Sequence, residues 1–117
     1  DALPILQIQQ VLLNLIVNAI DAMAGIDDRP LMLTVSSDNP QSGNIRLAIA
    51  DTGVGFTPEV QKRLFDSFYT TKEHGMGMGL SISYGIIEKH GGKLTAEPRQ
   101  PCGSVFTFTL PTHPAEA

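Results

Sequence analysis

Side chains that could bind a ligand recur at helical spacing inside an otherwise apolar stretch, residues 7–23 (QIQQVLLNLIVNAIDAM). Asn14, Asn18 and Asp21 follow one another at intervals of four and three residues, so they share one face of a helix. Asn and Asp are poor helix-interior residues, because their side chains compete for backbone hydrogen bonds. Since apolar residues enclose both asparagines, we expect a ligand site at Asn14 and Asn18. A solvated edge is the expectation for the glutamines of the same stripe, Gln7 and Gln10.

Two glycine stretches are the other chemical signals. Residues 51–56 (DTGVGF) place an acid after an expected strand and before Gly-x-Gly, which lets the backbone turn sharply and approach a ligand closely. Residues 75–80 (GMGMGL) open directly into an expected helix, so free amides and the helix dipole favour an anion there. The first stretch also fits an ordinary turn and the second a flexible loop. The second matches neither the Rossmann nor the P-loop spacing, so it would be a phosphate cradle of another kind.

Composition limits the class of protein. A chain of 117 residues, 42% of them hydrophobic, is long enough for one domain with one core. Its formal charge of −4 argues against nucleic acid as the main partner, and its one cysteine, Cys102, excludes an internal disulfide and a cysteine metal cluster. The sequence carries no signal-peptide pattern, and no uninterrupted apolar stretch approaches the roughly 20 residues of a membrane helix. We therefore expect a cytoplasmic domain without membrane contact.

The elements that must position these groups alternate between helices and strands. A first helix is expected to about Met23, and a short second helix should begin at a Thr57 cap. A third helix over residues 80–90 should end at a glycine pair, with His90 capping its C-terminus. Four strands are expected, over residues 31–37, 44–51, 93–97 and 104–110, the first two as an antiparallel hairpin.

Taken in order, five motifs resemble the catalytic ATP-binding domain of sensor histidine kinases, of the nitrogen-regulation and oxygen-sensing type: NLIVNAIDAM, DTGVGF, RLFDSFYTTK, GMGMGLSISYGIIEKHGG and GSVFTFTLP. The match covers nearly the whole chain. Residues 1–111 are expected to form one such domain, lacking an edge strand that usually lies upstream, and residues 112–117 a disordered tail. The resemblance implies an α+β Bergerat fold: a two-layer α/β sandwich, with about three helices on one face of a mixed, mainly antiparallel sheet.

The resemblance also implies roles for single residues. Asn18 matches the ligand of a Mg²⁺ that bridges the phosphates of ATP, and Asn14 would sit beside those phosphates. Asp51 matches the residue that reads the exocyclic amine of adenine, and Thr107 resembles a strand residue that supports this acid through a water. The other nucleotide-contacting positions are Asp21, Ala22, Gly53, Gly55, Lys72, Gly75, Gly77, Met78, Gly79 and Leu80.

Some of these positions leave alternatives open. Lys72 is the cation nearest the phosphate cradle, and it either binds a phosphate or is a solvated charge. Many family members carry a lysine and an aromatic residue where this chain has Asp21 and Ala22, so Asp21 could hold a magnesium water or pair with a lid residue. The lid, residues 69–78, should be anchored by Phe65 and Phe68 and order when a triphosphate binds.

The implied activity is transfer of the γ-phosphate of Mg-ATP to a histidine on a separate dimeric helical hairpin, with a response regulator downstream. The family's phosphoacceptor histidine is followed by an acid, and none of His74, His90 and His113 is. Two other functions stay open. One is an ATP hydrolase or switch of the gyrase and chaperone (GHKL) kind, although Asn14 stands where such enzymes carry a glutamate and cannot act as a base. The other is a nucleotide-binding interaction module without turnover.

Overall fold

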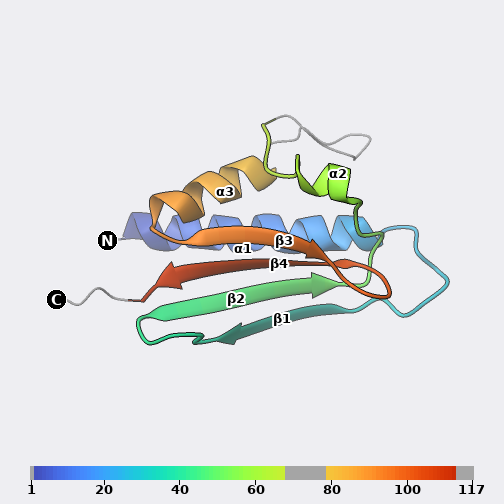
Figure 1. Ribbon diagram of the computed structural model, residues 1–117, viewed down its shortest axis with the longest axis horizontal. Helices are drawn as coiled ribbons and strands as arrows, with labels where there is room; N and C mark the ends of the chain where they lie inside the picture. The colour runs from blue at the N-terminus through green and yellow to red at the C-terminus, as the bar shows by residue number, and fades with distance from the viewer. Residues whose placement is uncertain (1, 68–78, 113–117) are drawn as a thin grey trace.

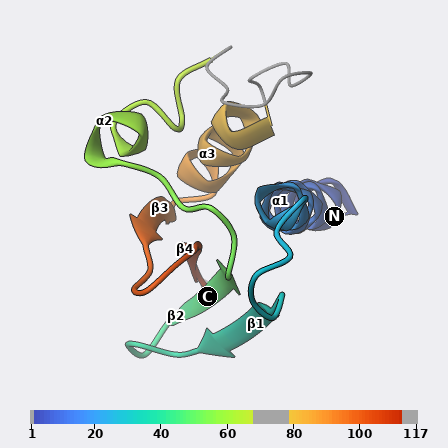
Figure 2. The ribbon, with the colours of Figure 1, turned by 90° about the vertical axis from the view of Figure 1, so that its right-hand side faces the viewer.

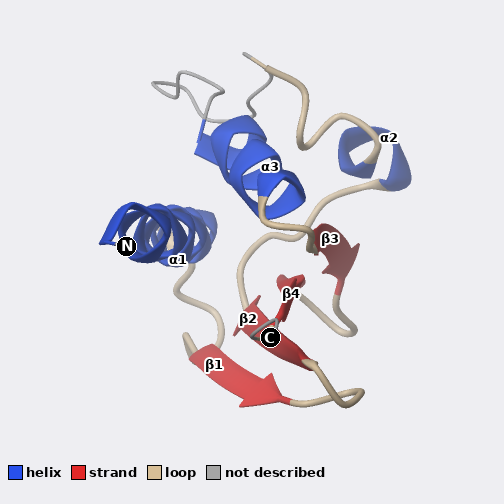
Figure 3. Ribbon diagram, turned by 90° about the vertical axis from the view of Figure 1, so that its left-hand side faces the viewer, coloured by secondary structure: helices blue, strands red, loops and turns tan. Residues whose placement is uncertain are grey.

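The computed structural model describes residues 2–67 and 79–112 of the chain (Figure 1). Its elements, in chain order, are α1 (Ala2–Met23), β1 (Leu33–Asp38), β2 (Asn44–Asp51), α2 (Pro58–Gln61), α3 (Gly79–Lys89), β3 (Lys93–Pro98) and β4 (Ser104–Pro111). The helices of this part of the chain all lie on one face of the sheet, as Figure 2 and Figure 3 show from its two ends. The expected two-layer α+β sandwich is confirmed.

The sheet has four strands in the order β1-β2-β4-β3. β1 and β2 form the expected hairpin, and β4 lies between β2 and β3. The expectation of a mixed sheet is not met, because every strand pair within residues 2–67 and 79–112 is antiparallel. The register places Asp51, at the end of β2, directly opposite Ser104 at the start of β4.

The core forms where α1 meets the sheet. Buried residues recur at every fourth position of α1, at Val11, Leu15 and Ala19, and pack with Ile49 of β2 and Phe108 of β4. Complete burial of one such aliphatic side chain contributes roughly 1.5–3 kcal/mol. This contact holds α1 against the middle of the sheet and so determines where its polar stripe lies.

α1 is more apolar than its buried face requires. Ile5, Leu13 and Ile20 are 62, 57 and 54% exposed. By length and composition, Pro4–Met23 would pass for a membrane-spanning helix, with 17% of its apolar window buried. The stretch is not uninterrupted, since Gln and Asn residues recur in it, but its mean hydropathy still passes this test. The core helix of a soluble protein passes the same test, so length and composition alone do not assign a membrane.

A short helix and an aromatic contact connect the hairpin to α3. Thr57 caps α2 as expected, because its hydroxyl oxygen accepts a hydrogen bond from Val60 N at 3.3 Å. The helix is only four residues long and ends at Gln61. Farther along the chain, Phe65 stacks on Tyr84 of α3 with ring centroids 5.1 Å apart. The lid that Phe65 is expected to anchor lies outside the described residues, so that role stays a prediction.

α3 ends at the expected glycine pair. Gly91 has a φ of 80°, and Gly92 N donates to Ile87 O at 2.9 Å, which closes the helix in the manner of a Schellman motif. A Cβ atom on Gly92 would lie 1.9 Å from Thr109 O of β4. Glycine is therefore needed where the chain leaves the helix and passes close to the sheet.

Two contacts correct details of the sequence analysis. His90 directly follows the last residue of α3, where it is expected, and its ring Nε2 lies 2.9 Å from Gln7 Oε1. The ring therefore also links α3 to α1, and Gln7 is not a free solvated edge. Thr112 N donates to Gly43 O at 2.7 Å, so hydrogen bonding continues one residue into the segment expected to be a disordered tail. The remaining tail, residues 113–117, lies outside the described residues.

The hairpin carries an exposed edge strand. β1 begins at Leu33, two residues later than expected, and all of its residues are exposed. At its far end Asp38 Oδ1 and Oδ2 accept hydrogen bonds of 2.9 and 2.6 Å from Arg46 Nε and Nη2. These bonds hold the pKa of the Asp38 carboxyl below its usual value.

Candidate functional site

One face of α1 brings the two glycine stretches together. Asn14, Asn18 and Ala22 recur every four residues and share this face. Gly79, the first residue of α3, lies next to Asn14, and Gly53 lies against Ala22. At a helical rise of about 1.5 Å per residue, these two contacts are about 12 Å apart along α1. The structure thus places one described glycine of each stretch, Gly53 and Gly79, along the helix face that the sequence singles out.

Asn14 links α1 to the first turn of α3. Its Nδ2 donates to Gly79 O at 3.2 Å and to Ser83 Oγ at 3.1 Å, and its Oδ1 accepts from Gln10 Nε2 at 2.8 Å. Both amide hydrogens therefore have protein partners, and Ser83 is completely buried. The side chain sets the spacing between the two helices, and its contact with a phosphate stays a prediction.

Asn18 occupies the middle of the face. It is half-buried, and within residues 2–67 and 79–112 no hydrogen bond engages its amide, so its oxygen is available as a ligand. The same residues contain no group of three or more His, Cys, Asp or Glu side chains that could hold a metal ion. A divalent cation at Asn18 would take most of its ligands from phosphate and water, which is how Mg²⁺ usually binds. Asp21, one turn on, is exposed, and both of its open roles stay predictions.

Asp51 is a completely buried carboxylate at the end of β2. Its Oδ1 accepts from Gly53 N at 2.8 Å, and its Oδ2 accepts from Ser104 Oγ at 2.9 Å. Both donors are neutral, and each carboxylate oxygen keeps a further lone pair. The carboxylate is therefore anchored and can still accept a hydrogen bond, as a reader of an amine must.

The support of Asp51 corrects the prediction for Thr107. Thr107 pairs with Ala48 rather than with Asp51, and it points to the face of the sheet away from the buried Phe106 and Phe108. Ser104, directly opposite Asp51, makes the contact instead. Side chains alternate between the two faces of the sheet along β4. This alternation could have identified Ser104, because it shares the face of the two buried phenylalanines, whereas Thr107 lies on the other face.

The glycines after Asp51 make room for protein backbone. A Cβ atom on Gly53 would lie 2.4 Å from Ala22 O, and Val54 N donates to that same oxygen at 3.1 Å. Gly55 has a φ of +70°, and a Cβ there would lie 2.9 Å from Gly103 O. We expected these glycines to admit an adenine base. In the structure they let the turn pack against α1 and the β3–β4 loop, and a contact with a base stays a prediction.

The family is decided by comparison with known proteins. A family model described as "Histidine kinase-, DNA gyrase B-, and HSP90-like ATPase" matches residues 4–114. The chain belongs to this ATPase family. Sensor protein FixL of Bradyrhizobium diazoefficiens is 49% identical over 106 residues, which are 90% of this chain and 20% of FixL. Sporulation kinase E of Bacillus subtilis is 39% identical over 105 residues, 90% of this chain and 14% of that kinase.

Solved structures within the ATPase family have the same fold. The catalytic domain of histidine kinase ThkA superposes with a TM-score of 0.77 at 37% identity, over 90% of this chain and 66% of that one. ThkA in complex with the response regulator TrrA gives a TM-score of 0.74 at 33% identity, over 94% of this chain and 30% of that one. The chain is thus similar to catalytic domains of histidine kinases, and it spans about a fifth of the length of FixL.

Two arginines of this family member escaped the sequence analysis. Arg29 donates to Thr52 O at 3.0 Å and to Gly53 O at 2.9 Å, and Arg99 Nη1 donates to Asp51 O at 2.9 Å. Each is a single cation in a polar loop, where no periodic pattern predicts a contact. Together they bind three successive carbonyls of the first glycine stretch.

Part of the site expected for an ATPase of this family lies outside the described residues: Lys72, Gly75, Gly77 and Met78, with the whole lid and Phe68. Gly79 and Leu80 are described and begin α3. The Leu80 side chain packs against the core, so only its backbone amide faces a ligand in the predicted arrangement.

Proposed function

We propose that this domain binds Mg-ATP and presents the γ-phosphate to a histidine on a separate helical hairpin. The observation that carries the proposal is the face of α1 defined by Asn14, Asn18 and Ala22, with Asp51 and Gly53 at one end and the start of α3 at the other. The length of this face, about 12 Å, suits an extended ligand with a base at one end and an anion at the other.

The Asp51 end would recognise the base. Its buried carboxylate accepts two hydrogen bonds from neutral donors and has lone pairs left for an exocyclic amine. Arg29 and Arg99 bind backbone carbonyls beside it rather than its oxygens. A carboxylate that can still accept a hydrogen bond favours adenine over guanine. The six-position amine of adenine donates a hydrogen bond, whereas the six-position carbonyl of guanine accepts one.

The α3 end would hold the phosphates. The N-terminus of α3 offers a favourable dipole, and Gly79 keeps this approach free of a side chain. Asn18 offers an amide oxygen to Mg²⁺, which would supply charge neutralisation on the phosphates. We assign Lys72 and the amides of residues 75–80 to the same phosphates on the family resemblance.

The contacts of Asn14 favour phosphoryl transfer over hydrolysis. A carboxamide is not a general base, so Asn14 cannot take a proton from water, and both hydrogens of its amide are donated to Gly79 O and Ser83 Oγ. A separate imidazole is already a nucleophile near neutral pH and needs less help from this domain. A response regulator would take the phosphoryl group next, by analogy with the ThkA–TrrA complex. Slow turnover would also fit a nucleotide-binding module without catalysis, and only transfer to a hairpin separates the two functions.

Nucleotide titration tests the base-reading part of the proposal. Calorimetry should show that ATP binds more tightly than GTP, because burying two facing acceptors costs about 1–3 kcal/mol. Asp51→Asn should reduce this preference, since an amide can also donate to the guanine carbonyl. Equal affinities of the unmodified chain for ATP and GTP would rule out the role of Asp51. Withholding magnesium should weaken ATP binding if Asn18 holds the metal.

A further inference from the structure

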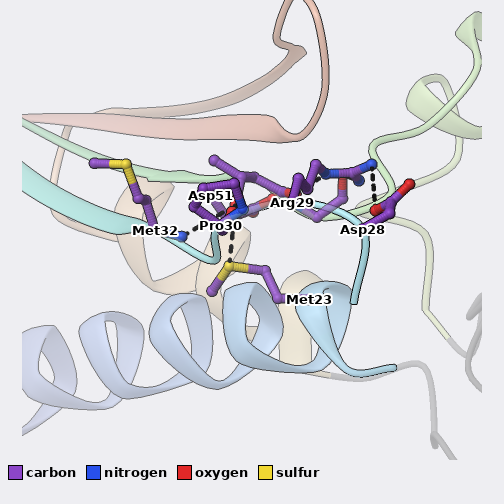
Figure 4. A network of polar contacts seen from close by, with 8 residues as sticks. Met23, Asp28, Arg29, Pro30, Met32 and Asp51 are labelled. Carbon is purple, nitrogen blue, oxygen red and sulfur yellow. Dashed lines mark hydrogen bonds and ion pairs between the residues drawn. The ribbon is translucent and has the colours of Figure 1, made fainter. Parts of the chain in front are cut away.

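The first glycine stretch is held from outside by an arginine of the α1–β1 loop. Arg29, shown among its neighbours in Figure 4, donates from Nε to Thr52 O at 3.0 Å and from Nη2 to Gly53 O at 2.9 Å. The planar guanidinium fork therefore binds two successive carbonyls. Its other contact, Asp28 at 3.5 Å, is an ion pair with a carboxylate that is 74% exposed, which contributes little. The hydrogen bonds to the two carbonyls are therefore the main interactions of Arg29.

One peptide unit connects Arg29 to the Asp51 carboxylate. The carbonyl of Thr52 and the amide of Gly53 belong to the same planar group. Its oxygen accepts from Arg29 Nε at 3.0 Å, while its N–H donates to Asp51 Oδ1 at 2.8 Å. Holding the oxygen fixes the direction of the N–H, and a positive charge at the oxygen polarises the amide and strengthens the bond that it donates.

The neighbouring contacts tie the loops together without using the carbonyl or the N–H of the 52–53 peptide. The Thr52 hydroxyl accepts from Met32 N at 3.0 Å, which ties the α1–β1 connection to the turn. Val54 N donates to Ala22 O at 3.1 Å, which ties the turn to α1. Both contacts bring Arg29 within reach of its carbonyls. The guanidinium then supplies the donor that orients the 52–53 peptide.

We propose that Arg29 is a positioning residue for the base-reading carboxylate. Acting through the 52–53 peptide, it holds Asp51 Oδ1 in place and thereby sets the preference of the site for an adenine over a guanine nucleotide. Arg29 itself touches no nucleotide in this arrangement. The selectivity part rests on the proposed role of Asp51 as the reader of the adenine amine.

The test compares Arg29→Met and Arg29→Lys with Arg46→Met in the 117-residue chain. Arg46 is a matched control, because it also makes a two-pronged contact, with Asp38, at the opposite end of β2 from Asp51. Arg29→Met removes every donor at nearly constant length, whereas Arg29→Lys keeps the charge without the fork. Melting temperatures establish that each variant is folded.

The first measurement needs no nucleotide: the NMR proton shift of the Gly53 amide. Arg29→Met should move this resonance upfield, because the hydrogen bond to Asp51 Oδ1 weakens when the peptide is free to turn. Arg29→Lys should move it less, and Arg46→Met should leave it in place. If Arg29→Met does not fold, Arg29→Lys carries the same comparison.

The second measurement is the ratio of ATP to GTP affinity by calorimetry. The ratio should fall about tenfold in Arg29→Met, the effect of one well-made hydrogen bond, and remain unchanged in Arg46→Met. A contact that only stabilises the fold would lower the melting temperature and leave both the ratio and the Gly53 shift as they are.

Either result in a folded Arg29→Met chain, an unmoved Gly53 resonance or an unchanged nucleotide ratio, overturns the proposal. Failure of the proposed function itself would be seen in the unmodified chain. If the unmodified chain shows no preference for ATP, the base-reading role of Asp51 falls and the selectivity part falls with it. The Gly53 shift still decides whether Arg29 holds the carboxylate.

Discussion

At the scale of single residues, the candidate site depends on how a buried charge is held. Asp51 is completely buried, and its oxygens accept from one backbone amide and one hydroxyl. Cations bind the backbone beside it, through Arg29 and Arg99, and not the carboxylate. This division keeps Asp51 fixed without using up its capacity to accept a further hydrogen bond.

Ser104 should therefore contribute to both ATP binding and stability, although its side chain is small. We expect Ser104→Ala to weaken ATP binding and to lower the free energy of unfolding by about 1–3 kcal/mol, because it leaves a buried carboxylate oxygen without its donor. Thr107→Ala, on the other face of the same strand, is the matched control and should leave ATP affinity unchanged. Calorimetry and chemical denaturation measure both effects. Equal losses of ATP affinity in the two variants would contradict the assignment.

The sequence predicts the positions of chemical groups here better than their partners. Asn18 stands out as an amide within an apolar helical stretch and Asp51 as an acid between a strand and Gly-x-Gly. The structure puts Asn18 on α1 and Asp51 at the end of β2. Arg29 could not be found in this way, since its contacts depend on the path of the α1–β1 loop. The family resemblance pointed to Thr107, whereas the alternation of faces along β4 places Ser104 on the side of Asp51.

At the scale of elements, α1 has two apolar sides with different environments. Leu15 is completely buried against the sheet, whereas Leu13 is 57% exposed. The helical period places the two leucines on different sides of the same helix. Periodicity alone predicted the helix and its polar stripe, but an all-round apolar helix does not reveal which side meets the sheet.

These two leucines form a natural pair of variants. Leu15→Ala should lower the free energy of unfolding by about 2–5 kcal/mol, since it leaves a cavity at the centre of the core. Leu13→Ala should change it by less than about 0.5 kcal/mol, because it lies on the surface. Urea denaturation followed by circular dichroism measures both. A loss at Leu13 as large as that at Leu15 would show that the exposed side of α1 is packed in solution.

The β1–β2 hairpin predicts a pH effect. Hydrogen bonds from Arg46 lower the pKa of Asp38 in the folded state, so the pair contributes stability above the unfolded value, near 3.9, and loses it as pH falls through the folded value. An NMR titration should find the Asp38 carboxyl below that value, and Arg46→Met should return it toward about 3.9. Both side chains are about half exposed, so salt should weaken the effect. An unshifted Asp38 would show that the contact does not persist in solution.

At the scale of the whole molecule, the fold was the most predictable level. The helices, the hairpin and the glycine pair after α3 follow from periodicity, turn residues and capping, and they agree with the structure to within a few residues. The order β1-β2-β4-β3 could not be derived from local pattern, because strand neighbours depend on long-range pairing. The family resemblance implies the two-layer sandwich but no strand order, which comes from the structure itself.

The whole-molecule prediction concerns phosphoryl transfer. The chain should hydrolyse ATP very slowly by itself, because Asn14 is a neutral amide whose hydrogens are donated to Gly79 and Ser83. With a dimeric phosphoacceptor hairpin from a sensor histidine kinase and labelled ATP, it should give an acid-labile phosphohistidine on the hairpin, since transfer needs chiefly positioning and charge neutralisation.

Asn18→Ala decides whether that transfer uses the proposed site. The variant should abolish labelling of the hairpin by removing the oxygen assigned to Mg²⁺, while its melting temperature stays near that of the unmodified chain, because no hydrogen bond within residues 2–67 and 79–112 depends on the Asn18 amide. Asn44→Ala, at the start of β2 and so at the opposite end of that strand from Asp51, is the matched control and should label normally. Gel autoradiography with acid treatment measures the product. Brisk ATP turnover by the chain alone, or undiminished labelling with Asn18→Ala, would contradict the mechanism.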